Sequence, residues 1–103
     1  LTGTELYYTG SICIDQDLLD AAGILEGEQV HVVNVNNGSR LITYTISGKR
    51  GSGIVELNGP AARLGMVGDK VVIITYAQMD ESEARVRKPT VVFVDEKNAL
   101  RQA

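Results

Sequence analysis

The stretch YYTGSICIDQDLL, residues 7–19, sets the start of the fold, because a β-favouring segment passes into a capped helix within it. Residues 6–14 are rich in Tyr, Thr and Ile, which favour strands, but the polar Thr9, Gly10 and Ser11 interrupt them. Glycine inside a strand weakens it and often marks a bulge, a kink or a close approach of the backbone. We therefore predict a strand that is broken at its centre, where a glycine carbonyl directly precedes a serine hydroxyl.

Short elements follow along the rest of the chain. Asp15 suits the N-cap of a helix over residues 16–22, and Gly23 suits its C-terminal end. Valine dominates a predicted strand over residues 29–35, and the Asn-Asn-Gly sequence after it favours a tight hairpin turn. The further predicted elements are strands over 41–46, 54–57, 70–76 and 90–94, a glycine-rich loop over 48–53, a helical turn over 61–64, a helix over 80–87 that begins with an Asp80–Glu83 capping box, and a polar, frayed tail from residue 95.

A weak internal repeat connects the two halves of the chain. AAGILEGEQV at residues 21–30 resembles AARLGMVGDKV at residues 61–71, and both run from an alanine turn through a Gly-acidic pair into a valine strand. Two related halves of this kind predict a closed barrel with pseudo-twofold symmetry, and closure would also remove exposed strand edges. Chance similarity is the alternative, because Gly-Asp before a strand is common turn chemistry. We predict one domain over residues 1–103, mostly β, with short helices.

Composition limits the classes of partner. The 103 residues are 44% hydrophobic and 22% charged, as in a globular domain. A net charge of -3 without a basic block argues against a nucleic-acid surface, and no apolar run reaches the roughly 20 residues of a membrane helix. No secretory signal is recognisable, and the single cysteine, Cys13, fits a reducing cytoplasm.

The Gly10–Ser11 pair suggests a chemical role as well as a structural one. A serine hydroxyl can attack the carbonyl of its own preceding peptide bond, and glycine there removes side-chain obstruction and permits strained backbone angles. The resulting ester can eliminate, which cuts the chain and leaves dehydroalanine, and hydrolysis then gives a pyruvoyl group. That ketone can form an imine with an amine and accept electrons. The ordinary alternative is that Gly-Ser marks only a bulge or a turn.

Several separate motifs in order give the pair a context. They are YTGS at 8–11, IDQDLLDAAGI at 14–24, NVNNG at 34–38, Arg40 with TY at 43–44, RGSG at 50–53, NG at 58–59 with AA at 61–62, and GD at 68–69. With these motifs, nearly the whole chain resembles the aspartate α-decarboxylase family, pyruvoyl enzymes that make β-alanine for pantothenate and coenzyme A.

The resemblance implies a double-psi β-barrel and a homotetramer with active sites between neighbouring subunits. It implies self-cleavage between Gly10 and Ser11, so that residues 1–10 end the short β chain and residues 11–103 form the α chain. Ser11 would then supply the covalent pyruvoyl cofactor that decarboxylates L-aspartate. The chain begins at Leu1 without an initiator methionine, so we expect residues upstream, where the family carries a lysine and a histidine near the site.

The resemblance also assigns roles to individual residues. Arg40 corresponds to the arginine that binds the substrate carboxylate, Thr43 to the threonine that supports self-cleavage, and Tyr44 to the proton donor. Neighbouring strand residues face opposite sides, so Thr43 and Tyr44 can share one site only through a local twist or through different subunits. Each also has an ordinary strand or surface role as an alternative. The other residues that the resemblance places at the site are Tyr8, Asn58, Gly59, Ala61 and Ala62.

Other features carry less chemistry. Pro60 departs from the family's usual alanine and removes a backbone N–H that could have contacted substrate. His31 is alone in the sequence, so we predict no metal site, and Cys13 fits a packed small side chain better than a reactive thiol. The alternatives to the enzyme are a non-enzymatic binding module and an unprocessed or inactive family member. Whether maturation needs a partner protein is open.

Overall fold

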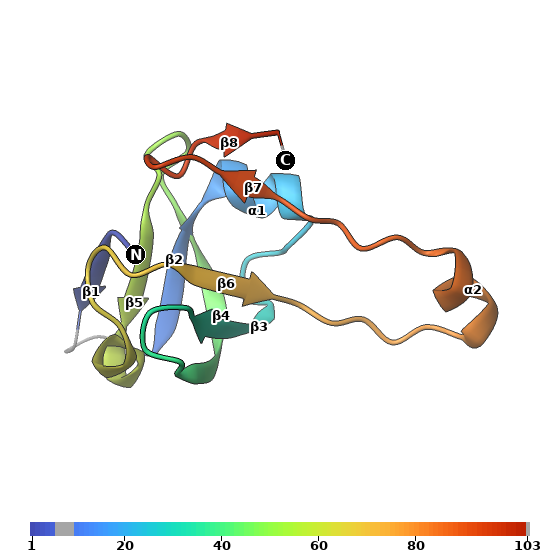
Figure 1. Ribbon diagram of the computed structural model, residues 1–103, viewed down its shortest axis with the longest axis horizontal. Helices are drawn as coiled ribbons and strands as arrows, with labels where there is room; N and C mark the ends of the chain where they lie inside the picture. The colour runs from blue at the N-terminus through green and yellow to red at the C-terminus, as the bar shows by residue number, and fades with distance from the viewer. Residues whose placement is uncertain (6–9, 103) are drawn as a thin grey trace.

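The computed structural model describes residues 1–5 and 10–102, so the predicted site residue Tyr8 lies outside the described residues. The described residues form two sheets and three short helical segments (Figure 1). The mostly β class with short helices is therefore confirmed. The elements are β1 (Gly3–Glu5), β2 (Ser11–Asp15), α1 (Gln16–Ala22), β3 (Gln29–Asn34), β4 (Arg40–Gly48), β5 (Val55–Asn58), the 3-10 helix η1 (Gly59–Leu64), β6 (Val71–Ile74), α2 (Glu81–Val86), β7 (Phe93–Val94) and β8 (Leu100–Arg101).

Strand β2 lies inside a six-stranded sheet with the order β1-β5-β2-β4-β3-β6. It runs parallel to β4, with Ile12 opposite Thr45, and antiparallel to β5, with Ile12 opposite Leu57. Strand β3 pairs antiparallel with both β4 and β6. Within the described part of the chain, β1 and β6 lie at the two ends of this order, so a closed barrel stays a prediction.

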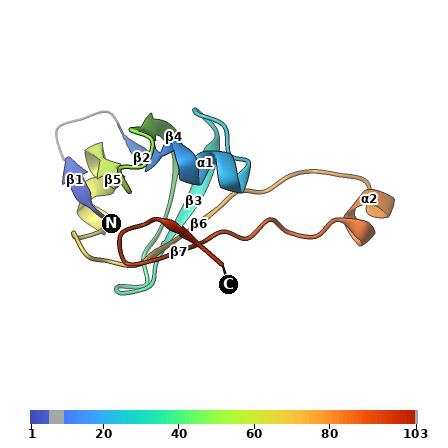
Figure 2. The same ribbon diagram turned by 90° about the horizontal axis from the view of Figure 1, so that it is seen from above.

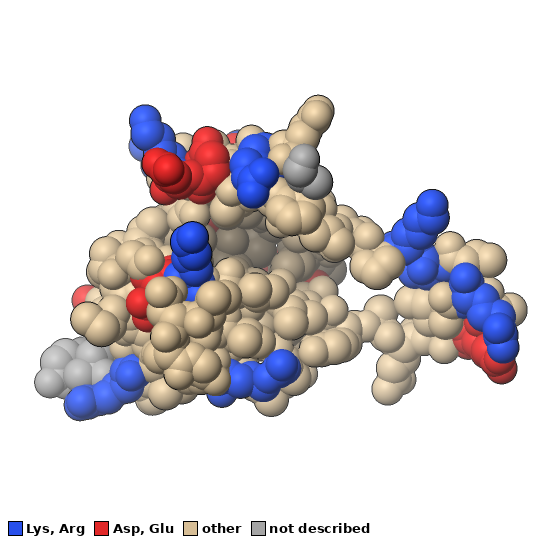
Figure 3. Space-filling view, viewed as in Figure 1, with Lys and Arg blue, Asp and Glu red and all other residues tan. Residues whose placement is uncertain are grey.

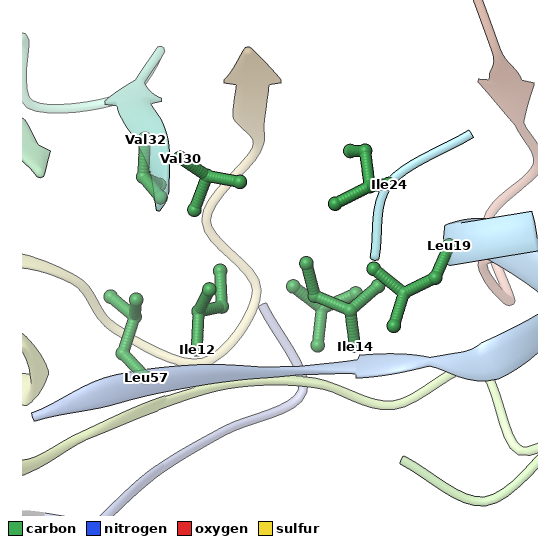
Figure 4. Packing of buried hydrophobic residues seen from close by; sticks show 8 residues of the cluster. Ile12, Ile14, Leu19, Ile24, Val30, Val32 and Leu57 are labelled. Atoms are coloured by element: carbon green, nitrogen blue, oxygen red, sulfur yellow. The ribbon is translucent and has the colours of Figure 1, made fainter. Parts of the chain in front are cut away.

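The core lies against one face of β2. Ile12 and Ile14 are two residues apart on the strand, so their side chains share one face and point into the same cluster. Figure 4 shows their side chains meeting those of α1, β3 and β5. The buried cluster consists of Ile12, Ile14, Leu19, Ile24, Val30, Val32, Val55 and Leu57.

Helix α1 begins and ends where the sequence predicts. The Asp15 carboxylate accepts the N–H of Asp17 at 2.8 Å, and Gly23 follows the last turn in the left-handed conformation. The same carboxylate is 3% exposed and also accepts the N–H groups of Gly51 and Gly53, at 3.1 and 2.8 Å. Burial alone would raise the pKa of this carboxyl, but these N–H groups hold the pKa below its usual value. One buried side chain thus caps the helix and binds the loop before β5 at Gly51 and Gly53.

The C-terminal tail differs from its prediction. The strand expected over residues 90–94 shortens to β7, and the tail expected to fray returns as β8 to pair with it. Asp95 closes this hairpin by accepting the N–H groups of Lys97 and Ala99, and Asn98 donates to the Gly53 carbonyl oxygen at 2.8 Å. The ordered tail therefore depends on a contact with a distant loop.

An arm leaves the body between β6 and β7. Residues 75–92 run out and back with α2 at the tip, and both views show the tip far from the sheet (Figures 1 and 2). Asp80 accepts the N–H of Glu83, which confirms half of the expected capping box, and Arg85 pairs with Glu81. Charged side chains of both signs gather at this tip (Figure 3). The helices of the described residues are all too short or too polar to cross a membrane.

Gly53 and Gly27 offer a matched test of the contact with the tail. Both have a positive φ, of 71° and 84°, so alanine strains either position by about 1 kcal/mol. A Cβ at Gly53 would also lie 2.3 Å from the Lys97 carbonyl oxygen, whereas one at Gly27 meets nothing within 4 Å. We expect Gly53→Ala to lower the free energy of unfolding in urea by about 3 kcal/mol, against about 1 for Gly27→Ala. Equal losses would contradict this packing of the tail.

Candidate active site around Gly10 and Ser11

Ser11 is the first residue of β2 and is fully buried. Asn58 lies opposite it on β5, is 4% exposed, and donates from Nδ2 to Ser11 Oγ at 3.0 Å. A hydroxyl in this position has lost its water, so the asparagine amide replaces part of its hydration. Strand β2 starts at the Gly10–Ser11 junction, and residues 6–9 of the strand predicted over residues 6–14 lie outside the described residues.

A sharp turn after Asn58 brings a second segment to this junction. Gly59 has a φ of 66°, a conformation that side chains disfavour, and Pro60 follows it in the first turn of η1, where its missing N–H costs little. A Cβ placed on Gly10 would meet only the Pro60 Cδ among described atoms, at 3.8 Å. The start of η1 therefore lies directly beside the Gly10–Ser11 junction.

That glycine permits strained backbone angles here stays a prediction, because the φ of Gly10 depends on Thr9, which lies outside the described residues. The distance of 3.8 Å to the Pro60 Cδ is an ordinary van der Waals contact.

A shallow hollow of about 230 Å³ opens beside Gly10. It brings together three residues predicted from the sequence, namely Gly10, Thr43 and Ala61, whereas Ala62 is not part of its lining. Gly59 is buried at the turn beneath it. The lining consists of Gly10, Leu41, Ile42, Thr43, Pro60, Ala61 and Leu64.

The two faces of β4 separate the remaining predicted residues. Extending the register of Ile12 with Thr45 places Gly10 level with Thr43. Thr43 is half-buried and lines the hollow, whereas Arg40 and Tyr44 are exposed and do not. The alternation predicted for Thr43 and Tyr44 is thus observed, and within one copy of the described chain these residues do not converge.

His31 has a partner that the sequence analysis missed. Its Nδ1 lies 3.5 Å from Arg40 Nη1, and its ring contacts Tyr76 edge-on, with centroids 5.0 Å apart. The antiparallel register pairs Val33 with Arg40, which makes His31 and Arg40 diagonal neighbours on one face. Counting back from the predicted hairpin turn would have found this pair.

Cys13 and the acidic groups offer no alternative centre. Burial raises the pKa of the Cys13 thiol, and the nearby carboxylates of Glu56 and Glu26 raise it further, which disfavours a reactive thiolate. Among residues 1–5 and 10–102, no three His, Cys, Asp or Glu side chains form a group that could hold a metal ion.

Comparisons with known proteins cover nearly the whole chain. Residues 1–101 match the family model described as aspartate decarboxylase. The aspartate 1-decarboxylase of Carboxydothermus hydrogenoformans is 62% identical over 100 residues, which are 97% of this chain and 79% of that protein. The enzyme of the same name from Ruminiclostridium cellulolyticum is also 62% identical, over 97% of this chain and 78% of its own length. That of Leptospira biflexa is 58% identical over 100% of this chain and 88% of its own.

Substitutions of Asn58 test the buried contact with Ser11. In Asn58→Asp, burial would raise the pKa of the new carboxyl above its unfolded value. At a pH below the pKa that this carboxyl has in the unfolded chain, the protonated acid can still donate to Ser11, so the free energy of unfolding falls little. As the pH rises above that pKa, the loss in the free energy of unfolding grows to about 2 kcal/mol.

Asn58→Ala is the comparison, because it removes the donor at every pH. We expect it to lose about 1–2 kcal/mol with the pH dependence of the unsubstituted chain. Urea unfolding of the uncut chains, in which Ser11 keeps its hydroxyl, measures both variants at about pH 4 and at neutral pH. Parallel pH profiles for the two variants would contradict the buried Asn58–Ser11 hydrogen bond.

Proposed function

The chain belongs to the aspartate decarboxylase family, and we propose that it converts L-aspartate to β-alanine with a pyruvoyl group made from its own Ser11. The observation that carries this proposal is the junction in a chain that matches the family from residue 1 to 101: a fully buried Ser11, held by Asn58, directly after a Gly10 that borders an open hollow. β-Alanine made in this way is a precursor of pantothenate and coenzyme A.

Self-cleavage begins with Ser11 Oγ as the nucleophile. It attacks the Gly10 carbonyl carbon, the C–N bond breaks, and an ester replaces the amide. Loss of a proton from the Ser11 Cα then breaks the Cβ–O bond, which leaves Gly10 with a free carboxylate and residue 11 as dehydroalanine. Hydrolysis adds one water and releases one ammonia, and residue 11 keeps a ketone. Residues 1–10 and 11–103 become separate chains.

The residues around the junction suit this chemistry. Asn58 Nδ2 donates to the Ser11 hydroxyl oxygen at 3.0 Å and so holds the nucleophile in place. Thr43 lines the hollow with Gly10, where its hydroxyl can polarise the Gly10 carbonyl, as oxyanion donors do. When formed, a pyruvoyl group supplies a carbonyl that takes up the substrate amine and accepts the electrons left by carbon dioxide.

Arg40 and Tyr44 carry the roles that concern the substrate. The Arg40 guanidinium offers a planar pair of donors to the carboxylate that β-alanine retains. The Tyr44 phenol returns a proton to the carbon from which carbon dioxide has left. Ala61 provides a small wall of the hollow, and the family resemblance adds Gly59, Ala62 and Tyr8 as substrate-binding residues, of which Tyr8 lies outside the described residues. Pro60, which has no N–H, contributes only its ring.

The outward direction of Arg40 and Tyr44 supports a site that is completed between subunits. Their face of the sheet also exposes large apolar side chains, Ile42, Val72 and Tyr76, at 57%, 48% and 67%. Apolar side chains gathered in this way favour contact with another protein surface. We propose a cytoplasmic homotetramer of double-psi β-barrels, in which Arg40 and Tyr44 of one copy reach the hollow of its neighbour.

Intact-mass analysis tests the origin of the ketone. We expect the purified protein to be cut between Gly10 and Ser11, with the larger fragment carrying a ketone in place of the serine amine. Ser11→Ala should stay in one piece because it lacks the nucleophile. Ser52→Ala, which removes an exposed hydroxyl from a distant loop, should be cut like the unsubstituted chain. Borohydride should attach labelled L-aspartate to the larger fragment only.

The alternatives give different results in the same experiment. A binding module or an unprocessed family member would retain an intact Gly10–Ser11 bond and would trap no aspartate. An intact bond in protein that still releases β-alanine would overturn the proposal, because the reaction would then lack its electron acceptor.

Replacing Arg40 tests substrate recognition separately from cleavage. Arg40→Ala should be cut normally but lose about 2–3 kcal/mol of carboxylate binding, or roughly 30- to 150-fold in kcat/KM. Arg40→Lys keeps the positive charge but loses the paired donors, so its kcat/KM should lie between those of the unsubstituted enzyme and Arg40→Ala. Arg50→Ala is the control, since Arg50 is exposed and pairs with Asp17 and Asp20 at 2.7 Å. Similar kinetics for Arg40→Ala and Arg50→Ala would refute this role.

A further inference from the structure

The carbonyl oxygen of Leu64, the last residue of η1, is a meeting point for the hairpin between β3 and β4. It accepts hydrogen bonds from Asn34 Nδ2, Asn37 Nδ2 and Ser39 Oγ, at 3.2, 3.0 and 3.1 Å. A carbonyl oxygen has two lone pairs, so three donors on one oxygen are more than its usual share. We call these three donors and the Leu64 carbonyl the Leu64 clasp.

Asn34 forms the buried centre of the clasp. It is 3% exposed, and its Oδ1 accepts the N–H groups of Asn36 and Asn37 at 2.9 and 3.3 Å. Its Nδ2 also donates to Asp69 Oδ2 at 2.8 Å, and this bond, followed by the N–H of Met66, lowers the pKa of Asp69. One amide side chain therefore folds the turn and attaches it to η1 and to the loop before β6.

The turn held by the clasp leads directly into Arg40. Ser39 binds Leu64 through its side chain, returns its carbonyl oxygen to the Asn34 N–H at 2.8 Å, and is followed by Arg40 as the first residue of β4. The other end of η1 follows Asn58, which holds Ser11. The clasp thus joins the backbone of Arg40 to the rim of the hollow within one subunit, whichever copy's Ser11 Arg40 serves.

We propose that Asn34, Asn37 and Ser39 are positioning residues that hold Arg40 for the substrate carboxylate through the Leu64 carbonyl. The inference rests on the role proposed for Arg40 and adds residues that touch neither substrate nor Ser11. Loss of the clasp releases the start of β4 while the Ser11–Asn58 contact stays in place. It therefore weakens binding of L-aspartate and leaves self-cleavage unchanged.

The double variant Asn37→Ala/Ser39→Ala tests the inference without opening the core. Both side chains lie outside the core, and the variant removes two of the three donors, whereas Asn34→Ala also removes a buried centre and can fail to fold. We expect complete cleavage at Gly10–Ser11, kcat within about twofold of the unsubstituted enzyme, and KM for L-aspartate raised about fivefold. The variant Asn37→Ala/Ser39→Thr keeps a hydroxyl at residue 39, so its KM should rise less than that of Asn37→Ala/Ser39→Ala.

A cycle with Arg40 separates positioning from general loosening. In an Arg40→Ala background the double variant should raise KM no further, because the group that it positions is gone. Ser52→Ala, which removes a comparable hydroxyl-to-carbonyl bond in the distant loop, should leave KM unchanged in either background. An unchanged KM in the double variant overturns the inference, as does an equal rise with and without Arg40. If the unsubstituted protein is neither cut nor trapped by borohydride, the proposed function fails instead, and the inference falls with it.

Discussion

The buried carboxylate of Asp15 is the constraint on which the body of the protein depends. A charge removed from water must be matched by donors, and Asp15 takes three from the backbone N–H groups of Asp17, Gly51 and Gly53. Those groups come from the helix after β2 and from the loop before β5, so one side chain closes both connections. The C-terminal hairpin then rests on the same loop through Asn98 and Gly53. The C-terminal hairpin therefore packs on a loop whose conformation is held by the Asp15 carboxylate.

The N-terminal end of β2 is fixed by the packing of the strand against the core. Ile12 and Ile14 fill the core, and a slip of one residue would turn both toward the other face of the sheet. Because the register is held in this way, Ser11 must lie opposite Asn58 and Gly10 must lie beside η1. The placement of the Gly10–Ser11 junction is therefore a property of the core.

Sequence reasoning succeeded where the deciding contacts are local. The bounds of α1 follow from Asp15 and Gly23 beside the helix, and the structure reproduces them. It failed for β8, because the tail is ordered by Gly53, far away in the sequence. The contact of His31 with Arg40 was missed because it depends on cross-strand register. The site itself was predicted from motifs shared with a family; periodicity alone would have left Gly10–Ser11 as a bulge or a turn.

Strand β4 carries residues for both steps of the proposed function, self-cleavage and turnover of L-aspartate. Its inward side chain Thr43 lines the hollow beside Gly10, while Arg40 and Tyr44 project outward from the same strand. Self-cleavage then needs only groups around one hollow, and turnover needs groups that a neighbouring copy can present. The clasp on Leu64 belongs to the second set, since it lies at the start of β4 and joins Arg40 to the hollow's rim. A strand whose neighbouring residues face opposite sides can in this way separate making the cofactor from using it.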